Sequence, residues 1–285
     1  MAEAIDGEPV NETPLLLPTE IGPIAAVLSL PDAEPDALVL IVQGSGGSRG
    51  GVNKVWTRLA RLLADDGIAM LRSDYAGMGE SWDADPRQRA VAIRELANWA
   101  AVQFEGVPIS AVANCFGLSP TLSLCRTRDV EAVLLMTPPL LKSNWLAALP
   151  TPTIRQRATA VATRARVLPR RLAYRARYGP AHRVLWVGQY ESGDPIPDLT
   201  ELVQRTATHV LIGSNDDCAS GLLELMPTLL THEVVELEVV DGMMLRGAAT
   251  PEVQHEIVTR IATWMRHTVA SRPERAAVTK SARHT

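Results

Sequence analysis

One short stretch, residues 112–117 (VANCFG), limits what this chain can fold into more than any other. It stands where an apolar run rich in β-branched residues, 107–112, meets a segment of helical composition. A sharp turn from strand to helix holds its central residue in a strained backbone conformation and leaves no room for bulk two positions to either side. Ala113 and Gly117 meet that requirement. Cys115 is therefore the residue that such a turn would present.

The position of Cys115 at the start of a helix favours its ionised form. The positive end of the helix dipole stabilises a negative charge, and it can lower the pKa of a thiol from about 8.5 to about 7 or below. A buried cysteine that only ends a core strand is the other interpretation of the same pattern. The flanking sequence favours the first interpretation.

Strand and helix patterns alternate along the rest of the chain. We expect strands at residues 15–17, 24–30, 37–42, 68–72, 107–112, 130–136, 209–212 and 234–240. We expect helices at residues 55–63, 90–102, 116–124, 220–230 and 251–265, the last with Thr250 as its cap and Pro251 in its first turn. Strands separated by helices of this length form crossover connections, so the sequence predicts an α/β fold with a mostly parallel sheet.

The composition is that of a large globular domain. The 285 residues are 46% hydrophobic and 21% charged, and no window approaches ~18 uninterrupted apolar residues, so no membrane span is expected. Residues 1–14 are acidic and polar and lack the basic-then-apolar pattern of an export signal. The three cysteines, Cys115, Cys125 and Cys218, lack the pairing of zinc ligands, which favours a reducing cytoplasm and no metal site.

Three motifs occur in the order and spacing of one known superfamily. They are the glycine-rich loop Gln43–Gly47, the segment Asp74–Ser81, which is similar to a D-x-x-G-x-G-x-S turn, and the elbow at Cys115. Together they resemble the α/β-hydrolase superfamily, in particular its serine-aminopeptidase and lysophospholipase-like branch, while a cysteine at the elbow resembles dienelactone hydrolases. The resemblance covers residues 39–136 well and residues 209–265 more loosely. It implies an α/β-hydrolase fold, with a mostly parallel central sheet flanked by helices and an inserted helical cap.

The resemblance also assigns roles to individual positions. In this superfamily two backbone amides bind the oxyanion of the tetrahedral intermediate, and they correspond to those of Ser45 and Phe116. The family's glycine loop usually begins with histidine, and Gln43 stands there instead, so we expect this loop to be braced differently. The spacing of the triad acid selects Asp216, with Asp217 as the alternate. Ordinary loop and helix-capping chemistry is the structural alternative for both.

The histidine of the triad is missing from its expected place. The resemblance puts it a few residues after the last strand, where this chain has residues 240–247 (VDGMMLRG). The six histidines are His182, His209, His232, His255, His267 and His284. His209 and His232 precede expected strands, so we expect them at the opposite edge of the sheet from Cys115. His182 and His255 are the two candidates for a displaced base, and a solvated surface position is the alternative for each.

Without that histidine, the nucleophile determines the chemistry. A thiol ionises to a useful extent unaided, so Cys115 can still be acylated. Release of the acyl group to water needs a general base, which contributes about 10²- to 10⁴-fold. The sequence therefore predicts an acyl-transfer enzyme or an enzyme that cleaves esters or thioesters. The alternatives are a lyase that uses the same pocket and a non-catalytic homologue that binds an acyl or carrier-linked ligand.

A basic segment precedes the strand expected at residues 209–212. Residues 142–183 hold ten of the chain's 28 basic residues and none of its 32 acidic residues, which leaves 18 basic and 32 acidic residues elsewhere. Arginines bind carboxylates and phosphates through paired hydrogen bonds, so Arg170 and Arg171 are candidates for docking a substrate linked to coenzyme A or to the phosphopantetheine of an acidic acyl carrier protein. A solvated basic face that pairs with the acidic body is the alternative. Too few aromatic residues are interleaved for a nucleic-acid partner.

These observations divide the chain into three expected parts. Residues 1–141 and 198–270 form the α/β-hydrolase core, residues 142–197 form the basic helical cap, and residues 271–285 form a flexible tail. The expected substrate is a small acyl compound, with no resident cofactor.

Overall fold

The computed structural model describes residues 11–44, 48–75, 78–81, 88–138, 196–214, 235–244, 247–248 and 250–271. Its strands are β1 (Asn11–Leu17), β2 (Ile24–Leu30), β3 (Ala37–Val42), β4 (Ile68–Ser73), β5 (Ile109–Asn114), β6 (Ala132–Met136), β7 (Ala207–Gly213), β8 (Val235–Val240), β9 (Met243–Met244) and β10 (Gly247–Ala248). Its helices are η1 (Val52–Lys54), α1 (Val55–Asp65), α2 (Arg89–Gln103), η3 (Cys115–Gly117), α3 (Leu118–Thr127), α6 (Ile196–Arg205) and α8 (Pro251–Ala270).

Eight of the strands form one sheet, in the order β1-β2-β4-β3-β5-β6-β7-β8. β2 pairs antiparallel with β1 and with β4. Every other neighbouring pair is parallel. The carboxyl ends of β3 to β8 therefore share one edge of the sheet, which is where open α/β sheets carry their binding sites.

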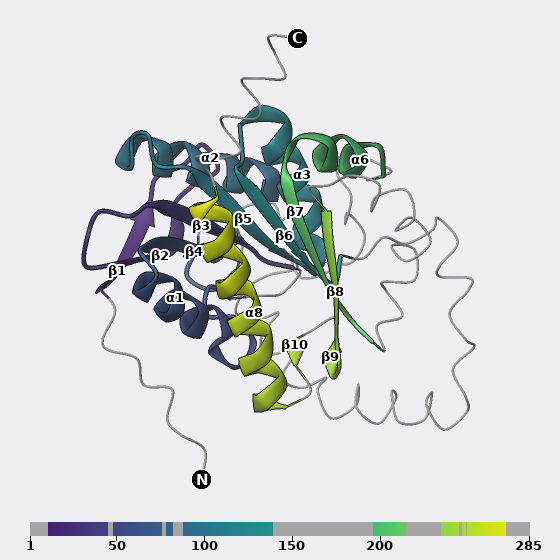
Figure 1. Ribbon diagram of the computed structural model, residues 1–285. Helices are drawn as coiled ribbons and strands as arrows, with labels where there is room; N and C mark the ends of the chain where they lie inside the picture. Colours follow the sequence, from purple (N-terminus) through teal and green to yellow (C-terminus); the bar gives the residue numbers. More distant parts are fainter. Residues whose placement is uncertain are drawn as a thin grey trace, which may run out of the picture.

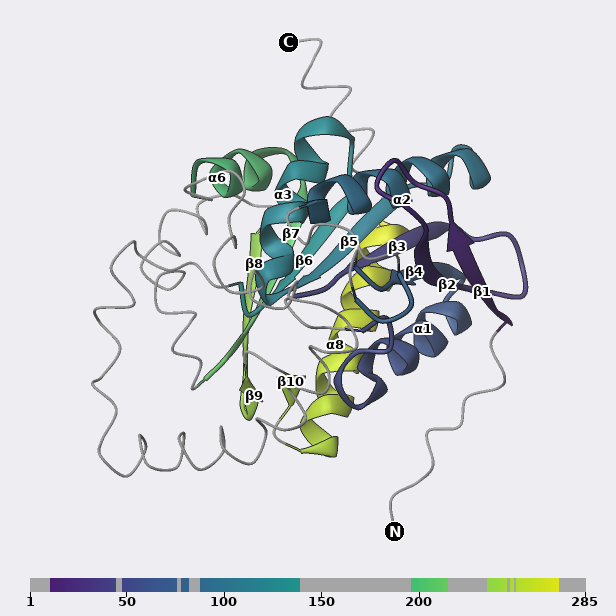
Figure 2. The ribbon, with the colours of Figure 1, turned by 180° about the vertical axis from the view of Figure 1, so that it is seen from behind.

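The central strands alternate their side chains between two helical layers. In β3, Leu38, Leu40 and Val42 pack in one hydrophobic cluster. Val39 and Ile41 pack in the other. α2, α3 and α6 cover the first face of the sheet, and α1 and α8 cover the second (Figures 1 and 2). Because both faces are covered, the central strands are almost entirely apolar.

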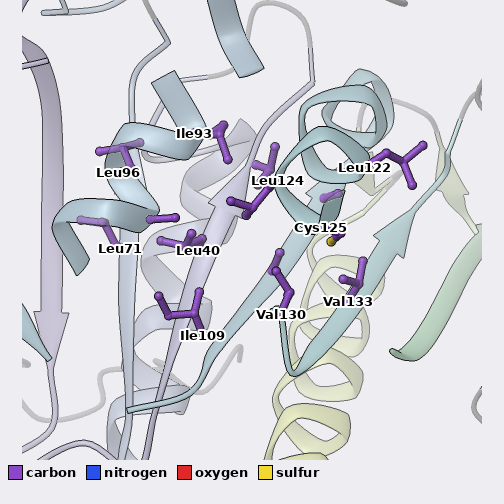
Figure 3. Close-up of a cluster of buried hydrophobic side chains, with 14 of the residues drawn as sticks. Leu40, Leu71, Ile93, Leu96, Ile109, Leu122, Leu124, Cys125, Val130 and Val133 are labelled. Carbon is purple, nitrogen blue, oxygen red and sulfur yellow. The ribbon is translucent and has the colours of Figure 1, made fainter. Parts of the chain in front are cut away.

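The first cluster joins the elbow helix to the sheet. Figure 3 shows Leu122 and Leu124 of α3 together with Ile93 of α2 and Val133 of β6. α3 is therefore held against the sheet over its whole length, which fixes the position of its first turn. That first turn carries the elbow.

The fold class expected from the sequence is confirmed, and every strand and helix expected within the described residues is present. Three features were not expected: η1, α6, and the two-stranded ladder of β9 and β10. α6 begins at Ile196, so its first two residues fall within the expected cap, 142–197. The helix expected at 220–230 and the other residues of the expected cap lie outside the described residues. None of the described helices combines the length and apolar character that a membrane crossing requires.

Candidate active site

Cys115 occupies a strained turn at the end of β5. Its φ is 52°, in the left-handed region, a conformation that costs a non-glycine residue about 1–3 kcal/mol. β5 ends at Asn114, Cys115 begins η3, and α3 follows directly. A Cβ on Gly117 would lie 2.1 Å from the carbonyl oxygen of Val42, so only glycine lets α3 approach β3 this closely. The strand-to-helix elbow expected from the sequence is present, with Cys115 at its apex.

Gly44 touches the elbow from the neighbouring strand. β3 and β5 pair in parallel with Val42 opposite Ala113, so the segments that follow the two strands run side by side. A Cβ on Gly44 would lie 2.9 Å from the Cβ of Cys115 and 3.5 Å from its Sγ. The glycine-rich loop therefore starts in contact with the candidate nucleophile. Ser45, the next residue of that loop, lies outside the described residues.

Gln43 ties the glycine-rich loop to the segment after β4. Its buried side chain donates a hydrogen bond from Nε2 to the carbonyl oxygen of Ser73 at 2.9 Å. Its own carbonyl oxygen accepts a hydrogen bond from the hydroxyl of Tyr75. Gln43 thus supplies the different bracing that the sequence led us to expect where the family has histidine.

Asp74 holds the same two segments together through a buried carboxylate. Its Oδ1 accepts a hydrogen bond from the backbone N–H of Arg49 at 2.7 Å. Its Oδ2 accepts one from the Arg49 guanidinium and one from the N–H of Glu80 at 3.2 Å. A Cβ on Gly79, whose φ is 55°, would lie 2.2 Å from Oδ2. The role of Asp74 is therefore structural, and the glycine of its motif is needed for close approach to the carboxylate.

Tyr75 packs against a buried cation and lies near Cys115. Arg89, the first residue of α2, places its guanidinium carbon 5.2 Å from the centre of the Tyr75 ring. Burial raises the pKa of Tyr75, the charge of Arg89 lowers it, and the charge of a Cys115 thiolate raises it. Charges have such effects only over short, poorly screened distances. Tyr75 therefore lies close to both other side chains. It belongs to the Asp74–Ser81 motif, which assigned it no role, and no local pattern in the sequence pointed to Arg89.

Thr137 adds a second strained residue at this edge of the sheet. It follows β6, its φ is 43°, and it is buried. Its N–H donates a hydrogen bond to the carbonyl oxygen of Leu211 at 2.7 Å, whereas its hydroxyl has no hydrogen-bond partner in the described part of the chain. Strained backbone and unsatisfied polar groups concentrate at functional sites, and neither feature could be predicted from the sequence.

The two described cysteines, Cys115 and Cys125, differ in their surroundings. Cys115 is 8% exposed at the end of the sheet. Cys125 lies in the core cluster beneath α3 (Figure 3), and burial raises its pKa to about 12. Of these two thiols, only Cys115 lies at the carboxyl edge of the sheet.

His209 lies inside β7 and not before it, which corrects the expectation from the sequence. Its buried ring places Nδ1 3.1 Å from the carboxylate of Glu236 and Nε2 3.4 Å from that of Glu238, both on the edge strand β8. Burial lowers the pKa of His209. With Trp264 and Arg260 of α8, these residues line a groove of about 530 Å³. None of the groove's lining residues belongs to the elbow or to the glycine-rich loop.

The loop that lacks the family's histidine folds back onto the core. Met243 and Met244 form β9, which pairs antiparallel with β10. Met243 is 1% exposed and packs in the cluster beneath α8 with Ile257 and Ile261. The side chain at position 243 therefore contributes to the packing of this cluster.

Of the remaining site residues predicted from the sequence, only His255 and Phe116 lie within the described residues. His255 is exposed on α8, beside Gln254, whose Nε2 donates hydrogen bonds to the carbonyl oxygens of Val52 and Asn53. Its role as a displaced base stays a prediction. Phe116 directly follows Cys115 at the elbow, as expected. Outside the described residues lie Ser45, Asp216, His182, Arg170 and Arg171.

The sheet order, the elbow and the flanking helices together define a class: the chain has the α/β-hydrolase fold. A carboxyl esterase from Bacillus coagulans matches with a TM-score of 0.60 at 11% identity, over 90% of this chain and 99% of that chain. An esterase from Pyrococcus furiosus matches with a TM-score of 0.62 at 14% identity, over 90% of this chain and 91% of that chain. Dienelactone hydrolase from Anabaena variabilis matches with a TM-score of 0.54 at 13% identity, over 90% of this chain and 98% of that chain. No family model and no curated protein matches the sequence.

Proposed function

We propose that this protein cleaves esters or thioesters by forming an acyl-enzyme on Cys115, and that it passes the acyl group to an acceptor. The observation that carries the proposal is the elbow: a cysteine at φ 52° whose side chain is in contact with Gly44 of the glycine-rich loop. A non-glycine residue is kept in such a conformation where the surrounding structure and the function require it. The structurally similar esterases and dienelactone hydrolase support a reaction that cleaves an ester.

In the first half-reaction, the Cys115 thiolate attacks the carbonyl carbon of the donor. The negative charge moves to the carbonyl oxygen, where the backbone N–H groups of Phe116 and Ser45 would donate hydrogen bonds. The intermediate then collapses as the bond to the leaving group breaks, and the acyl group remains on sulfur. A thiolate leaves with less need of a proton than an alkoxide does, so the lack of a histidine in the loop after β8 favours thioester donors.

In the second half-reaction, the acceptor attacks the acyl-cysteine and releases the thiolate. Water needs a general base for this step, and the loop that should supply one carries Met243 and Met244. A thiol or an amine is a better nucleophile and depends less on that help. We therefore favour transfer over hydrolysis. Asp216 would orient a displaced base if His182 or His255 serves as one.

The charge of the chain supports a carrier-linked donor. Residues 142–183 are strongly basic, whereas the rest of the chain is acidic, so Arg170 and Arg171 would receive the phosphates of coenzyme A or the surface of an acidic acyl carrier protein. A cytoplasmic setting would keep the Cys115 thiol reduced. The missing histidine equally favours a second candidate, in which the same pocket performs an elimination or only binds an acyl ligand.

Thiol release from a simple acyl thioester tests the proposal. Wild-type protein should release thiol, Cys115→Ala should release none above background, and Cys125→Ala, a change of a buried cysteine in the following helix α3, should keep the activity. Equal rates in wild type and Cys115→Ala would overturn the proposal and leave the binding or lyase alternative.

A further inference from the structure

The groove beside His209 lies between β8, the last strand in the order of the sheet, and the C-terminal half of α8. Its volume of about 530 Å³ is within the range of binding clefts, about 300–1,000 Å³. Thr259, Thr263, His267 and Ser271 of α8 line it at intervals of four residues, so they share one side of the helix. The groove therefore follows α8 over about 18 Å, which is the length of about five residues of extended chain.

The wall of the groove that faces α8 carries an accessible carboxylate, Glu236 of β8. Its side chain is 61% exposed, and Nδ1 of His209 lies 3.1 Å from its carboxylate. Burial lowers the pKa of His209, so the imidazole is neutral at pH 7 and does not cancel the charge of Glu236. Glu238, two residues further along β8, pairs with Arg260 of α8. Glu236 is therefore a group on this wall that a cation entering the groove can contact.

A basic segment of the chain begins at one end of the groove. Ser271 lines the groove and ends α8, where its N–H and its hydroxyl donate hydrogen bonds to the carbonyl oxygen of His267. Pro273 follows two residues later, and proline at this position does not continue a helix. Residues 272–285 lie outside the described residues. They include one acidic residue, Glu274, and four basic residues, Arg272, Arg275, Lys280 and Arg283.

We propose that residues 272–285 turn back along α8 and dock in this groove, with the guanidinium of Arg275 on the carboxylate of Glu236. Trp264 lies seven residues before Ser271, about 10 Å along the helix axis. Four residues of extended chain span at most about 14 Å, so Arg275 reaches the level of Trp264. At that level the rings of Trp264 and His209 are 5.3 Å apart, and His209 contacts Glu236.

The opposite charges of groove and segment favour this pairing, and a guanidinium binds a carboxylate through paired hydrogen bonds. The docked segment is independent of the proposed function, because none of the groove's lining residues belongs to the elbow or to the glycine-rich loop.

Cleavage of the full chain by a lysine-specific endoprotease tests the docking. The chain has three lysines, Lys54, Lys142 and Lys280, and mass spectrometry gives the rate of the cut after Lys280 in the native protein. This rate follows the undocked fraction of the segment. Glu236→Gln should raise it about two- to fivefold, the effect of one largely exposed ion pair. Glu201→Gln is the matched control, because Glu201 of α6 is also 61% exposed and pairs with Arg205, and it should leave the rate unchanged.

Changing Arg275 tests the other half of the pair. Arg275→Gln should raise the same rate as much as Glu236→Gln does, and the double variant should be no faster than either single variant. Unchanged rates in both single variants would show that the segment does not dock, and effects that add in the double variant would show that the two side chains do not meet. Either result overturns the proposal. Protection that increases with protein concentration would also overturn it, because the groove would then hold the segment of a second copy.

Discussion

Cys115 and Thr137 stand side by side at the ends of adjacent parallel strands, and both have left-handed backbones, with φ values of 52° and 43°. The residues before them, Asn114 and Met136, are paired in the sheet. A left-handed backbone conformation costs about 1–3 kcal/mol at a residue other than glycine. Two such residues at one point make this edge of the sheet the candidate functional site on physical grounds, independently of any resemblance.

The close approach of α3 to β3 should depend on Gly117. In Gly117→Ala, the new Cβ would lie 2.1 Å from the Val42 carbonyl oxygen although the φ of −63° is acceptable for alanine. We expect the free energy of unfolding to fall by about 3 kcal/mol, as for an overpacked core. Gly106→Ala is the control, because its φ is 80° but nothing lies within 4 Å, and it should cost about 1 kcal/mol. Urea unfolding of both variants measures the difference, and a larger cost at Gly106 would contradict this explanation.

The hydroxyl of Tyr75 should matter for the glycine-rich loop more than its ring does. Tyr75→Phe keeps the ring beneath Arg89 and removes the hydrogen bond to the Gln43 carbonyl oxygen. We expect stability to fall by about 1 kcal/mol. We also expect kcat to fall more than KM rises, because the loop that carries the Ser45 amide is less fixed. Thermal unfolding and steady-state kinetics test the two effects separately. An unchanged kcat would mean that the bond does not position the loop.

The two described cysteines should differ in reactivity. With its pKa raised to about 12, Cys125 has a thiolate fraction of about 10⁻⁴ at pH 8, and the thiolate is the reactive form. Limited iodoacetamide treatment of the native protein should therefore modify Cys115 first, and we expect Cys218 to react more slowly as well. Peptide mapping shows the order. Faster labelling of Cys125 or Cys218 would remove Cys115 from its proposed role.

His209 should make the fold less stable in mild acid. Burial lowers its pKa in the folded protein, so as the pH falls below about 6.5 the unfolded chain takes up a proton before the folded one does. The stability of the wild type should therefore fall with pH in this range more steeply than that of His209→Gln. Urea unfolding at pH 7.5 and pH 5.5 measures the difference. His255→Gln, which changes an exposed histidine, is the control. A steeper fall in His209→Gln than in wild type would mean that the pairing with Glu236 and Glu238 outweighs burial.

The parts of the fold that could be predicted from the sequence are those whose cause is local. The elbow could be predicted because Ala113 and Gly117 flank Cys115 at fixed spacing, and β3 could be predicted because a strand covered on both faces is continuously apolar. Gln43 could be recognised as a departure from the family's loop. Its hydrogen bond to Ser73, thirty residues away, could not.

The rest of the site depends on contacts between distant segments. Thr137 is strained where the chain leaves β6 while still bonded to Leu211 of β7, and nothing in its neighbours along the chain shows this. In the sequence, Arg89 is an ordinary charged residue at a helix start, and its burial and its contact with the Tyr75 ring could not be predicted from its neighbours. His209 was misplaced because β7 begins two residues earlier than its apolar run suggests.

The fate of an acyl group on Cys115 tests the central claim most directly. The protein should be pulsed with an acyl thioester, separated from the donor, and followed by intact-mass and peptide mass spectrometry in buffer and after addition of a thiol or amine acceptor. We predict one adduct, on Cys115, that persists in buffer and disappears when the acceptor is added. The adduct should be absent from Cys115→Ser, because a serine without a base is not ionised. An adduct at another residue, or rapid thioester turnover by Cys115→Ser, would contradict the claim.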